Sequence, residues 1–312
     1  AVKQCALYAH YRHEMNWRIE RNAIWLDFGT CWHKAMDAVC ESVCWNKSTA
    51  QAAVDAGYEA FVLEWTRLGR SSNPTITEIE EWSPRTPGIA KEMLTQYVKV
   101  RYDWLRYKIK LLAIEQPFAV PLDLQNPTIF QVGRLDKVFE EEAGIFVIEH
   151  KTTTSVSGTI KTGYEIRHSF IESFDPDSQP EGYDAAAHFL YPGKARGVKI
   201  DAALVHKTEH GKFRIVPLMH SKKCLLVYQA EALYWAQSWL DFRKTGFFPR
   251  NTKSCVDQFG KTCPYIGTCR TYHAANKDAP LPNGMKVEKW EPFDIEMLNK
   301  IAQEVLNGHQ CT

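Results

Sequence analysis

Ionisable residues gather in the stretch VGRLDKVFEEEAGIFVIEHKTTT of this 312-residue chain. Asp136 comes before an acidic bend that contains glycine, and Glu149 and Lys151 come after it. If two strands flank the bend, Asp136 lies opposite Glu149 or the residue before it, with facing Cβ atoms about 5 Å apart. Glu149 and Lys151 then share one face of their strand, because side chains alternate along it. Two carboxylates and an ammonium group are therefore expected close together.

Two interpretations of this pattern differ in their chemistry. An exposed hairpin with an ordinary Glu-Lys pair would contribute little to stability. Alternatively, the two carboxylates hold a cation between them, since they would not both stay ionised without one. Mg²⁺ suits such oxygen ligands, and the backbone carbonyl of His150 and waters would complete its shell. The metal would stabilise charge during phosphodiester hydrolysis, and Lys151 would hold or deprotonate the attacking water.

The residue pattern predicts the strands that such a hairpin needs. β-Branched and aromatic residues cluster in several short runs between Pro, Asn and Gly, which is typical of strands. The expected strands, in chain order, are AIEQPFAV, IFQVGRLDKVF, GIFVIEHK, VKIDAALVHK and FRIVPL. The last two flank a hairpin turn at TEHGK. With a helix between the third and fourth strands, this order implies a mixed sheet flanked by helices.

Helical spacing of apolar residues predicts the remaining elements. The expected helices cover residues 48–67, 91–113, about 177–190, 224–246 and the segment DIEMLNKIAQEVL. A turn at Gly29-Thr30 is expected to start a further helix with Thr30 as its N-cap. The Gly-, Pro- and Ser-rich segment 69–88 is expected to be a loop with at most one helical turn. The helices before the strands would form a helical lobe.

Two more motifs accompany the hairpin. FGTCWHKAMD contains a G-T-x-x-H pattern that ends at His33, and SQPEGYDAAAHFLY contains Q-x-x-x-Y. Gln179 and Tyr183 of the second motif lie one turn apart on one helix face. Taken singly, these are typical of a structural histidine near a helix start and of a polar helix face. In this order, together with G-x-x-D and E-x-K, they resemble the PD-(D/E)XK nuclease superfamily. More narrowly, they resemble its RecB-like branch, which includes AddB-type nucleases and the CRISPR adaptation exonucleases.

The resemblance implies a fold and a division of the chain. The fold would be α/β, a restriction-endonuclease-like mixed sheet with an αβββαβ core flanked by helices, plus an N-terminal helical lobe. Residues 1–45 and 113–275 would form the nuclease core, closed by a cysteine cluster. Residues 46–112 would be a helical insertion, and 276–312 a C-terminal helical tail.

The resemblance also implies a role for each motif residue. His33, Asp136, Glu149 and the backbone carbonyl of His150 would bind Mg²⁺ or Mn²⁺, and Lys151 would activate water. Gln179 and Tyr183 would position the lysine and the DNA backbone. Glu115, on the preceding strand, either supports a second metal or faces solvent.

The cysteines of SCVDQFGKTCPYIGTC form a local trio with the spacing C-x7-C-x5-C. A closed tetrahedral or cluster site needs a fourth thiolate. The N-terminal stretch CALYAHYRHEMNW supplies a candidate and resembles the start of RecB-like nucleases with an iron–sulfur cluster. The resemblance implies a [4Fe–4S] cluster held by Cys5, Cys255, Cys263 and Cys269. The first interval is long because VDQFGKT looks inserted, and this insertion weakens the case for Cys255 as a ligand. Zinc on the same thiolates and a set of free buried cysteines stay open, since the sequence does not separate Zn²⁺ from [4Fe–4S].

Charge and composition indicate the partner. The chain has a formal net charge of +1, but twelve Lys and Arg face only four Asp and Glu between residues 194 and 253. Such an excess suits phosphate contacts that position DNA without reading sequence. The candidate contacts are Lys194, Arg196, Lys222 and Lys223. Tyr164, Phe170 and Phe174 are candidates for stacking on unpaired bases. The sequence contains no recognisable groove-reading module and no Walker A loop.

The predicted function is a metal-dependent DNA exonuclease that acts on DNA ends or single strands and carries a structural iron–sulfur cluster. The alternatives are a non-catalytic DNA-end-binding scaffold of the same fold, which a broken Asp-Glu-Lys set would indicate, and an endonuclease. Recombination or replication proteins are further expected partners. No stretch approaches the roughly 18 apolar residues of a membrane span. The start of the sequence lacks signal-peptide features, so a cytoplasmic location in a bacterial or virus-infected cell is expected.

Overall fold

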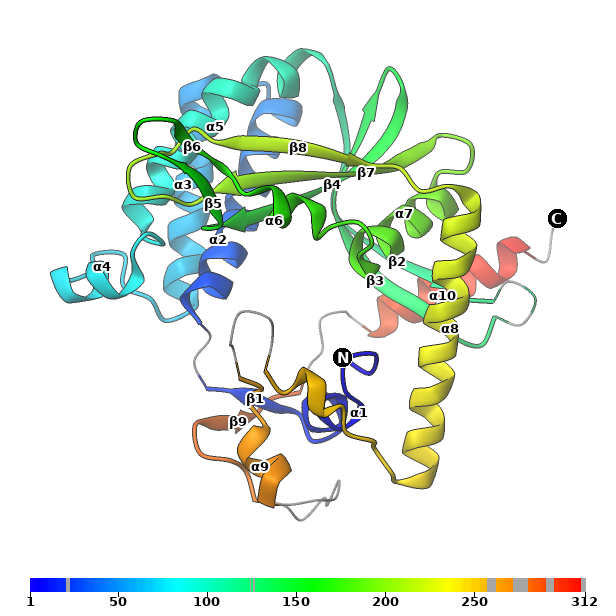
Figure 1. Ribbon diagram of the computed structural model, residues 1–312. Coiled ribbons are helices and arrows are strands. Elements are labelled where there is room, and N and C mark those ends of the chain that lie inside the picture. Colours follow the sequence, from blue (N-terminus) through cyan, green and yellow to red (C-terminus); the bar gives the residue numbers. More distant parts are fainter. Residues whose placement is uncertain are drawn as a thin grey trace. The chain divides into compact units, whose positions relative to one another are not determined.

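The computed structural model describes residues 1–20, 23–123, 125, 127–256, 262–271, 280–289 and 295–309 (Figure 1). The chain forms two compact units. The first, here called the cysteine unit, comprises Ala1–Asn22, Pro121–Gln131 and Gln229–Thr312. The second, here called the sheet unit, comprises Ala23–Val120 and Val132–Tyr228. The division into core, insertion and tail expected from the sequence is a different one and stays a prediction.

A five-stranded mixed sheet in the order β2-β3-β4-β7-β8 carries the predicted hairpin. Its strands are β2 (Lys110–Pro121), β3 (Phe130–Glu141), β4 (Gly144–Thr153), β7 (Ala195–Leu204) and β8 (Phe213–Leu218). β3 and β4 pair antiparallel, β4 and β7 pair parallel, and β7 and β8 pair antiparallel. The predicted mixed sheet, and each of its five strands, is confirmed.

The β3–β4 hairpin has the register that the sequence predicted. Lys137 pairs with Ile148, so the next position places Asp136 beside Glu149. The strands are joined by a two-residue turn, and Gly144 follows it with φ of +133°. A Cβ at that position would lie 2.6 Å from the carbonyl oxygen of Lys194, so a side chain would disrupt the start of the β4–β7 pairing.

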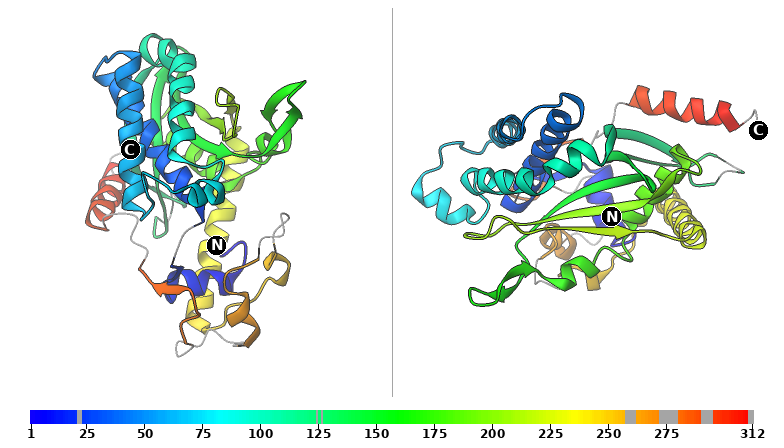
Figure 2. Two further views of the ribbon diagram at one scale, coloured as in Figure 1. Left: turned by 90° about the vertical axis from the view of Figure 1, so that its left-hand side faces the viewer. Right: turned by 90° about the horizontal axis from the view of Figure 1, so that it is seen from above.

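Helices cover both faces of this sheet, as the two views in Figure 2 show. One core packs α2 (Ile24–Cys40), α3 (Ala50–Arg67) and α5 (Pro87–Tyr107) against strand residues such as Phe139 and Ile148. The other core packs α7 (Ser178–Leu190) against the opposite face, through residues that include Val147 and Ile200. The predicted helix at about 177–190 is therefore confirmed. Its N-cap, Asp177, accepts a hydrogen bond from the amide of Gln179 and so fixes where the helix starts.

Three local predictions were wrong. Thr30 is not an N-cap, because α2 starts at Ile24 and the Thr30 hydroxyl donates to the carbonyl of Leu26 within the helix. The fully buried Phe28 and Trp32, one turn apart, hold this segment helical despite Gly29. The helix expected at 91–113 ends at Tyr107, and β2 begins three residues later. The segment 69–88 contains α4 (Ile76–Trp82), which a capping box between Thr75 and Glu78 stabilises.

The cysteine unit brings the two ends of the chain together. β1 (Trp17–Ile19) pairs antiparallel with β9 (Met285–Val287). The other elements here are α1 (Ala6–Ala9), a π-helical turn (His10–Glu14), a 3₁₀ turn (Thr252–Ser254), α9 (Ile266–Thr271) and α10 (Ile295–His309). Tyr11 stacks on Trp17 at 5.0 Å between ring centroids, and Tyr265 donates a hydrogen bond to the Trp17 carbonyl. The hydrogen bond from Tyr265 and the β1–β9 pairing join segments more than 240 residues apart.

α8 (Lys222–Thr245) includes residues of both units. Within the described ranges, none of the helices combines the length and the apolar character needed to cross a membrane.

Candidate metal centre

Three predicted metal ligands converge in the sheet unit. His33 comes from α2, Asp136 from β3 and Glu149 from β4, and one ligand atom of each lies within 4.8 Å of the other two. His33 Nδ1 lies 2.9 Å from Asp136 Oδ2. Sequence spacing set the two carboxylates opposite each other, whereas the histidine reaches them only through the packing of α2 on the sheet.

The donor set fits a hard divalent cation. Glu149 is only 2% exposed, and its Oε2 atom is buried without accepting a hydrogen bond from any described donor. A buried carboxylate oxygen without a partner is costly. Two carboxylates and an imidazole around one point would satisfy this oxygen if a divalent ion bound there.

The protonation states of the metal-free cluster follow from the burial of its ionisable groups and from their short mutual distances. Burial, followed by the charge of Asp136, raises the pKa of Glu149 to about 7. Burial alone would also raise the pKa of Asp136, but the hydrogen bond and charge of His33 outweigh burial and hold that pKa below its usual range. Burial opposes the charge on His33, yet the bond to Asp136 raises the pKa of this imidazole. The metal-free site therefore pairs a His33 cation with the Asp136 carboxylate beside a partly protonated Glu149.

Stabilisation by Mg²⁺ or Mn²⁺ is expected to grow as the pH rises from about 6 to about 8. Metal binding needs Glu149 ionised and His33 neutral, so at low pH the ion must displace protons. With a Glu149 pKa of about 7, the ionised fraction of this group rises roughly tenfold over that range. The raised pKa values of both groups stabilise the metal-free fold at low pH, and this contribution is lost as pH rises through the folded pKa values. Thermal unfolding with and without metal at each pH measures both trends, and a metal-induced shift that falls with pH would contradict them.

Lys151 and the two residues of the α7 motif meet beside Glu149. The Lys151 ammonium contacts Glu149 Oε1 and donates to Gln179 Oε1 at 2.8 Å. The Gln179 amide nitrogen donates to Glu149 Oε1 at 3.3 Å and to the Tyr183 hydroxyl at 3.2 Å. Gln179 is thus a bridge that fixes the lysine, the glutamate and the tyrosine in one arrangement. Because Asp177 caps the helix at this point, the position of Gln179 is itself restrained.

A buried polar layer lies behind the site, and the sequence did not predict it. The His150 amide donates to Asp136 Oδ2 at 3.4 Å, while the fully buried imidazole lies 3.7 Å from Asp201 Oδ2, its neighbour on β7. Asp201 accepts a hydrogen bond from Tyr97 at 2.7 Å and one from Arg101. Burial, followed by the charge of Lys137, keeps the pKa of His150 well below its usual range. These bonds fix the strands that carry Asp136 and Glu149.

Lys137 extends this layer. It is fully buried beside Asp136 in sequence, and its ammonium lies 2.8 Å from Asp37 Oδ1. Asp37 is on α2, so this ion pair ties α2 to β3 near His33. Lys34, on the same helix, lies 3.1 Å from the other oxygen of Asp37. The available signal in the sequence was charged residues inside otherwise apolar strands, as in VKIDAALV. A partner so far along the chain is not visible in a local pattern.

Glu115 is outside the cluster of metal ligands. Its Oε2 atom lies 3.3 Å from Arg134, and its φ of +52° is in the left-handed region. The pairing with Arg134 gives Glu115 a structural explanation that needs no second metal.

The predicted DNA contacts are dispersed on the sheet unit. Arg196 donates hydrogen bonds to the carbonyls of Ala143, Gly193 and Ala195, so its guanidinium braces the β3–β4 turn. Lys194 is exposed at the start of β7. This end of the sheet lies about 16 Å along β4 from Glu149, since each residue advances about 3.3 Å. Lys222 and Lys223 are exposed at the first turn of α8. Their contact with DNA stays a prediction.

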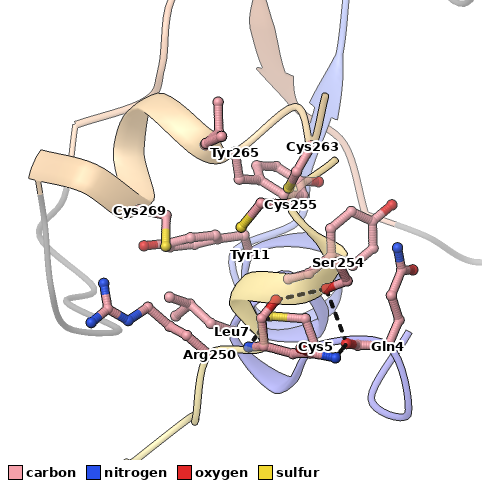
Figure 3. Close-up of a pocket in the computed structure, with 13 residues that line it drawn as sticks. Gln4, Cys5, Leu7, Tyr11, Arg250, Ser254, Cys255, Cys263, Tyr265 and Cys269 are labelled. Atoms are coloured by element: carbon pink, nitrogen blue, oxygen red, sulfur yellow. Dashed lines mark hydrogen bonds between the residues drawn. The ribbon is translucent and has the colours of Figure 1, made fainter. Parts of the chain in front are cut away.

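The four predicted cluster cysteines line one pocket in the cysteine unit, where their sulfurs gather around Tyr11 (Figure 3). These residues are Cys5, Cys255, Cys263 and Cys269. The Asn251 amide donates to the sulfur of Cys5 at 3.4 Å. Burial, followed by interactions that include those with the other three thiols, raises the pKa of Cys263. The structure therefore places the N-terminal cysteine and the distant trio at one pocket, and their role as ligands stays a prediction.

The long first interval of the trio does not separate its cysteines. Val256 and Thr262 form an antiparallel bridge, and the Cys263 amide donates to the Cys255 carbonyl at 2.8 Å. The bridge brings both ends of the predicted insertion together, whereas its middle, 257–261, lies outside the described residues. Cys255 is thus next to Cys263 despite the seven intervening residues.

The other cysteines lie elsewhere. Cys31, Cys40 and Cys44 are buried in the helical core of the sheet unit, and burial raises the pKa of each thiol. Cys224 is exposed, and Cys311 is outside the described residues.

Comparisons with known proteins identify the class to which this fold and site belong. The model of the PD-(D/E)XK nuclease superfamily matches residues 1–270, and the chain belongs to that superfamily. A solved Eubacterium rectale structure named "Putative exonuclease" is similar to it, with 10% identity, a TM-score of 0.45, and coverage of 79% of this chain and 77% of that one. No curated protein matches the chain. PD-(D/E)XK nucleases use divalent metal ions, in agreement with the donor set at His33, Asp136 and Glu149. The RecB-like branch stays a prediction.

Proposed function

We propose that this protein is an Mg²⁺- or Mn²⁺-dependent exonuclease that hydrolyses DNA at ends or in single strands. The observation that carries this proposal is the convergence of His33, Asp136 and Glu149, with the Lys151 ammonium in contact with Glu149. A histidine, two carboxylates and a lysine at one point are a complete set for metal-assisted phosphodiester hydrolysis. Membership in a nuclease superfamily supports it.

The metal would be held by the imidazole of His33 and the carboxylates of Asp136 and Glu149, with the His150 carbonyl as the proposed backbone ligand. When bound, the ion supplies positive charge that stabilises the transition state of phosphodiester cleavage. The buried polar layer around Asp201 contributes indirectly, because it restrains the backbone from which these ligands extend.

Lys151 would orient the attacking water and, when its amine is neutral, accept the water's proton at Nζ. Gln179 Oε1 accepts a hydrogen bond from this ammonium and so directs it, while the Gln179 amide nitrogen is bonded to Glu149 and Tyr183. The bridge keeps the lysine beside the proposed metal ligand before substrate arrives. Such preorganisation lowers the cost of reaching the reactive arrangement.

Cleavage from ends is favoured over internal, sequence-specific cleavage because the sequence shows no groove-reading module. End-labelled linear duplex, single-stranded DNA and a covalently closed circle, each with metal or with EDTA, test this choice. We expect metal-dependent loss of the linear molecules and survival of the circle. Cutting of the circle at the same rate would identify an endonuclease, and binding without cleavage in any metal would identify an end-binding scaffold.

A structural [4Fe–4S] cluster is the second part of the proposal and supports placement in the RecB-like branch. Four thiols line one pocket, and the bridge next to Cys255 and Cys263 keeps the trio together. Zinc on the same four thiolates is the alternative.

Cys263→Ser is expected to lower the melting temperature by about 5 °C or more and to abolish the brown colour of anaerobically purified protein. The physical reason is that one lost ligand destabilises a group that joins the N-terminal and C-terminal segments of the cysteine unit. Iron content, visible absorbance and thermal unfolding measure the effect. Cys224→Ser, at an exposed cysteine of the sheet unit, is the matched control and should change none of them. A colourless wild type with stoichiometric zinc would refute the cluster while keeping the four-cysteine site.

A further inference from the structure

A separate β-hairpin follows the strand that carries Glu149 and Lys151. β5 (Val156–Thr159) pairs antiparallel with β6 (Gly163–Ile166), and neither strand belongs to the five-stranded sheet. Both views in Figure 2 show this green hairpin standing out from the sheet unit. The strands predicted from the sequence do not include this hairpin, so its shape is a finding of the structure.

The tip of the hairpin is fixed by its own hydrogen bonds. The Thr159 amide donates to the Thr162 hydroxyl at 2.8 Å, and the Thr162 amide donates to the Thr159 carbonyl at 3.2 Å. Gly158 has φ of +89°, and a Cβ there would lie 2.0 Å from the Gly163 carbonyl, so glycine permits the close approach of the strands. A bonded turn of this kind holds its outermost side chains in one place.

The side chain at the end of this turn is Ile160, which is 86% exposed. Single exposed apolar residues are common on protein surfaces and need no function by themselves. Ile160 differs because a restrained turn holds it away from the sheet, next to a cation, Lys161. Some DNA-bending proteins insert an apolar side chain between base steps, and basic residues contact phosphates.

The base of the hairpin is anchored next to the catalytic strand. Ile166 packs in one buried cluster with Ala202 and Leu204 of β7. Ala202 is the register partner of Lys151, so the anchor lies one strand away from the proposed catalytic lysine. Arg167 closes the base by donating two hydrogen bonds to the Val156 carbonyl. Force applied at the tip would therefore be transmitted to a packed part of the sheet unit rather than to a loose loop.

The dimensions suit the end of a DNA duplex. Four residues of extended chain from Val156 to Thr159 span about 13 Å, close to the rise of roughly four base pairs. If the site acts on one unpaired DNA strand, the terminal base pair has to open, and that pair has a stacked neighbour on one side only. A rigid apolar tip on a hairpin of this length can occupy the position that the separated bases leave.

We propose that the β5–β6 hairpin is a strand-separating pin, in which Ile160 inserts at the terminal base pair of duplex DNA and Lys161 contacts a phosphate. One of the two separated DNA strands then continues to the site at Lys151. This inference rests on the proposed nuclease function and names its preferred substrate, a duplex end.

Ile160→Ser tests the pin, and Ile76→Ser is the matched control. Ile76 is an isoleucine of similar exposure, 78%, in α4 of the same unit. The measured quantity is the rate of cleavage of a blunt duplex divided by the rate for the same sequence as a single strand. Ile160→Ser should lower this ratio by about tenfold or more, because the wedge no longer offsets the cost of unstacking. Ile76→Ser should leave the ratio at the wild-type value.

A measurement without cleavage separates failure of the pin from failure of the nuclease. A duplex with 2-aminopurine at its terminal pair is added in EDTA to wild type and to Ile160→Ser. Fluorescence should rise with wild type and stay low with the variant. If wild type cleaves no DNA yet raises the fluorescence, the nuclease proposal fails and the pin stands. An unchanged ratio, an equal fall with both Ile→Ser variants, or no difference in fluorescence between wild type and Ile160→Ser would overturn the pin.

Discussion

Lys151→Ala is expected to lower the rate of DNA cleavage by about a thousandfold, within the range of 10²–10⁴ typical of a group that transfers a proton in the transition state. The ammonium lies against Glu149 and is directed by Gln179, so its removal deprives the attacking water of its orienting group. Folding should be retained, because the truncation leaves the buried contacts of β4 with β7 in place.

Initial rates on end-labelled DNA and anisotropy titrations with the same DNA separate chemistry from binding. We expect kcat to fall while the dissociation constant changes by only a few-fold. Lys91→Ala is the matched control, since that lysine packs on the ring of Tyr58 in the helical part of the sheet unit. Unchanged turnover by Lys151→Ala would remove the proposed role from this residue, and equal losses in both variants would indicate a nonspecific effect.

Glu149→Gln is expected to abolish both cleavage and the stabilisation of the protein by divalent metal. The Glu149 pKa is about 7, so at a pH near 6 the carboxyl of the metal-free protein is mostly protonated. A neutral amide of the same shape replaces it there with little loss of stability. With metal present, the substitution lowers the stability relative to wild type, because the amide is a much weaker ligand than an ionised carboxylate. We expect cleavage to fall by about a thousandfold or more.

Thermal unfolding with increasing Mn²⁺ measures the metal effect directly. Wild type should gain stability with metal concentration, whereas Glu149→Gln should show a flat response. Glu140→Gln is the control on the same hairpin, since Glu140 pairs with Lys110 and is not part of the cluster. A metal-induced shift that survives in Glu149→Gln would mean that the ion binds at another place.

The parts of the site that were predictable from sequence are those fixed by local periodicity. Alternation along β4 placed Glu149 and Lys151 on one face, and the short bend set Asp136 opposite Glu149. Helical spacing placed Gln179 and Tyr183 together, because residues four apart share a helix face. Resemblance to a nuclease family was needed to add His33, since no local rule brings a distant helix to the hairpin.

The parts that escaped prediction depend on contacts far apart in sequence. The Asp201 layer joins β4, β7 and α5, and nothing near Asp201 indicates its partners Tyr97 and Arg101. The Gly29-Thr30 pair suggested a helix start, but burial of Phe28 and Trp32 overrides this local signal. The seven-residue interval before Cys263 likewise weakened the case for Cys255 as a ligand. The bridge between Val256 and Thr262 brings the two cysteines together despite this interval.

The most direct test of a metal-dependent nuclease is one time course on end-labelled linear DNA. Wild type in Mn²⁺, wild type in EDTA, and Lys151→Ala in Mn²⁺ are compared after identical purification. We predict that the DNA is degraded only by wild type with metal. DNA that stays intact with wild type in Mn²⁺, or that Lys151→Ala degrades equally fast, would contradict the assignment of His33, Asp136, Glu149 and Lys151 as a catalytic centre.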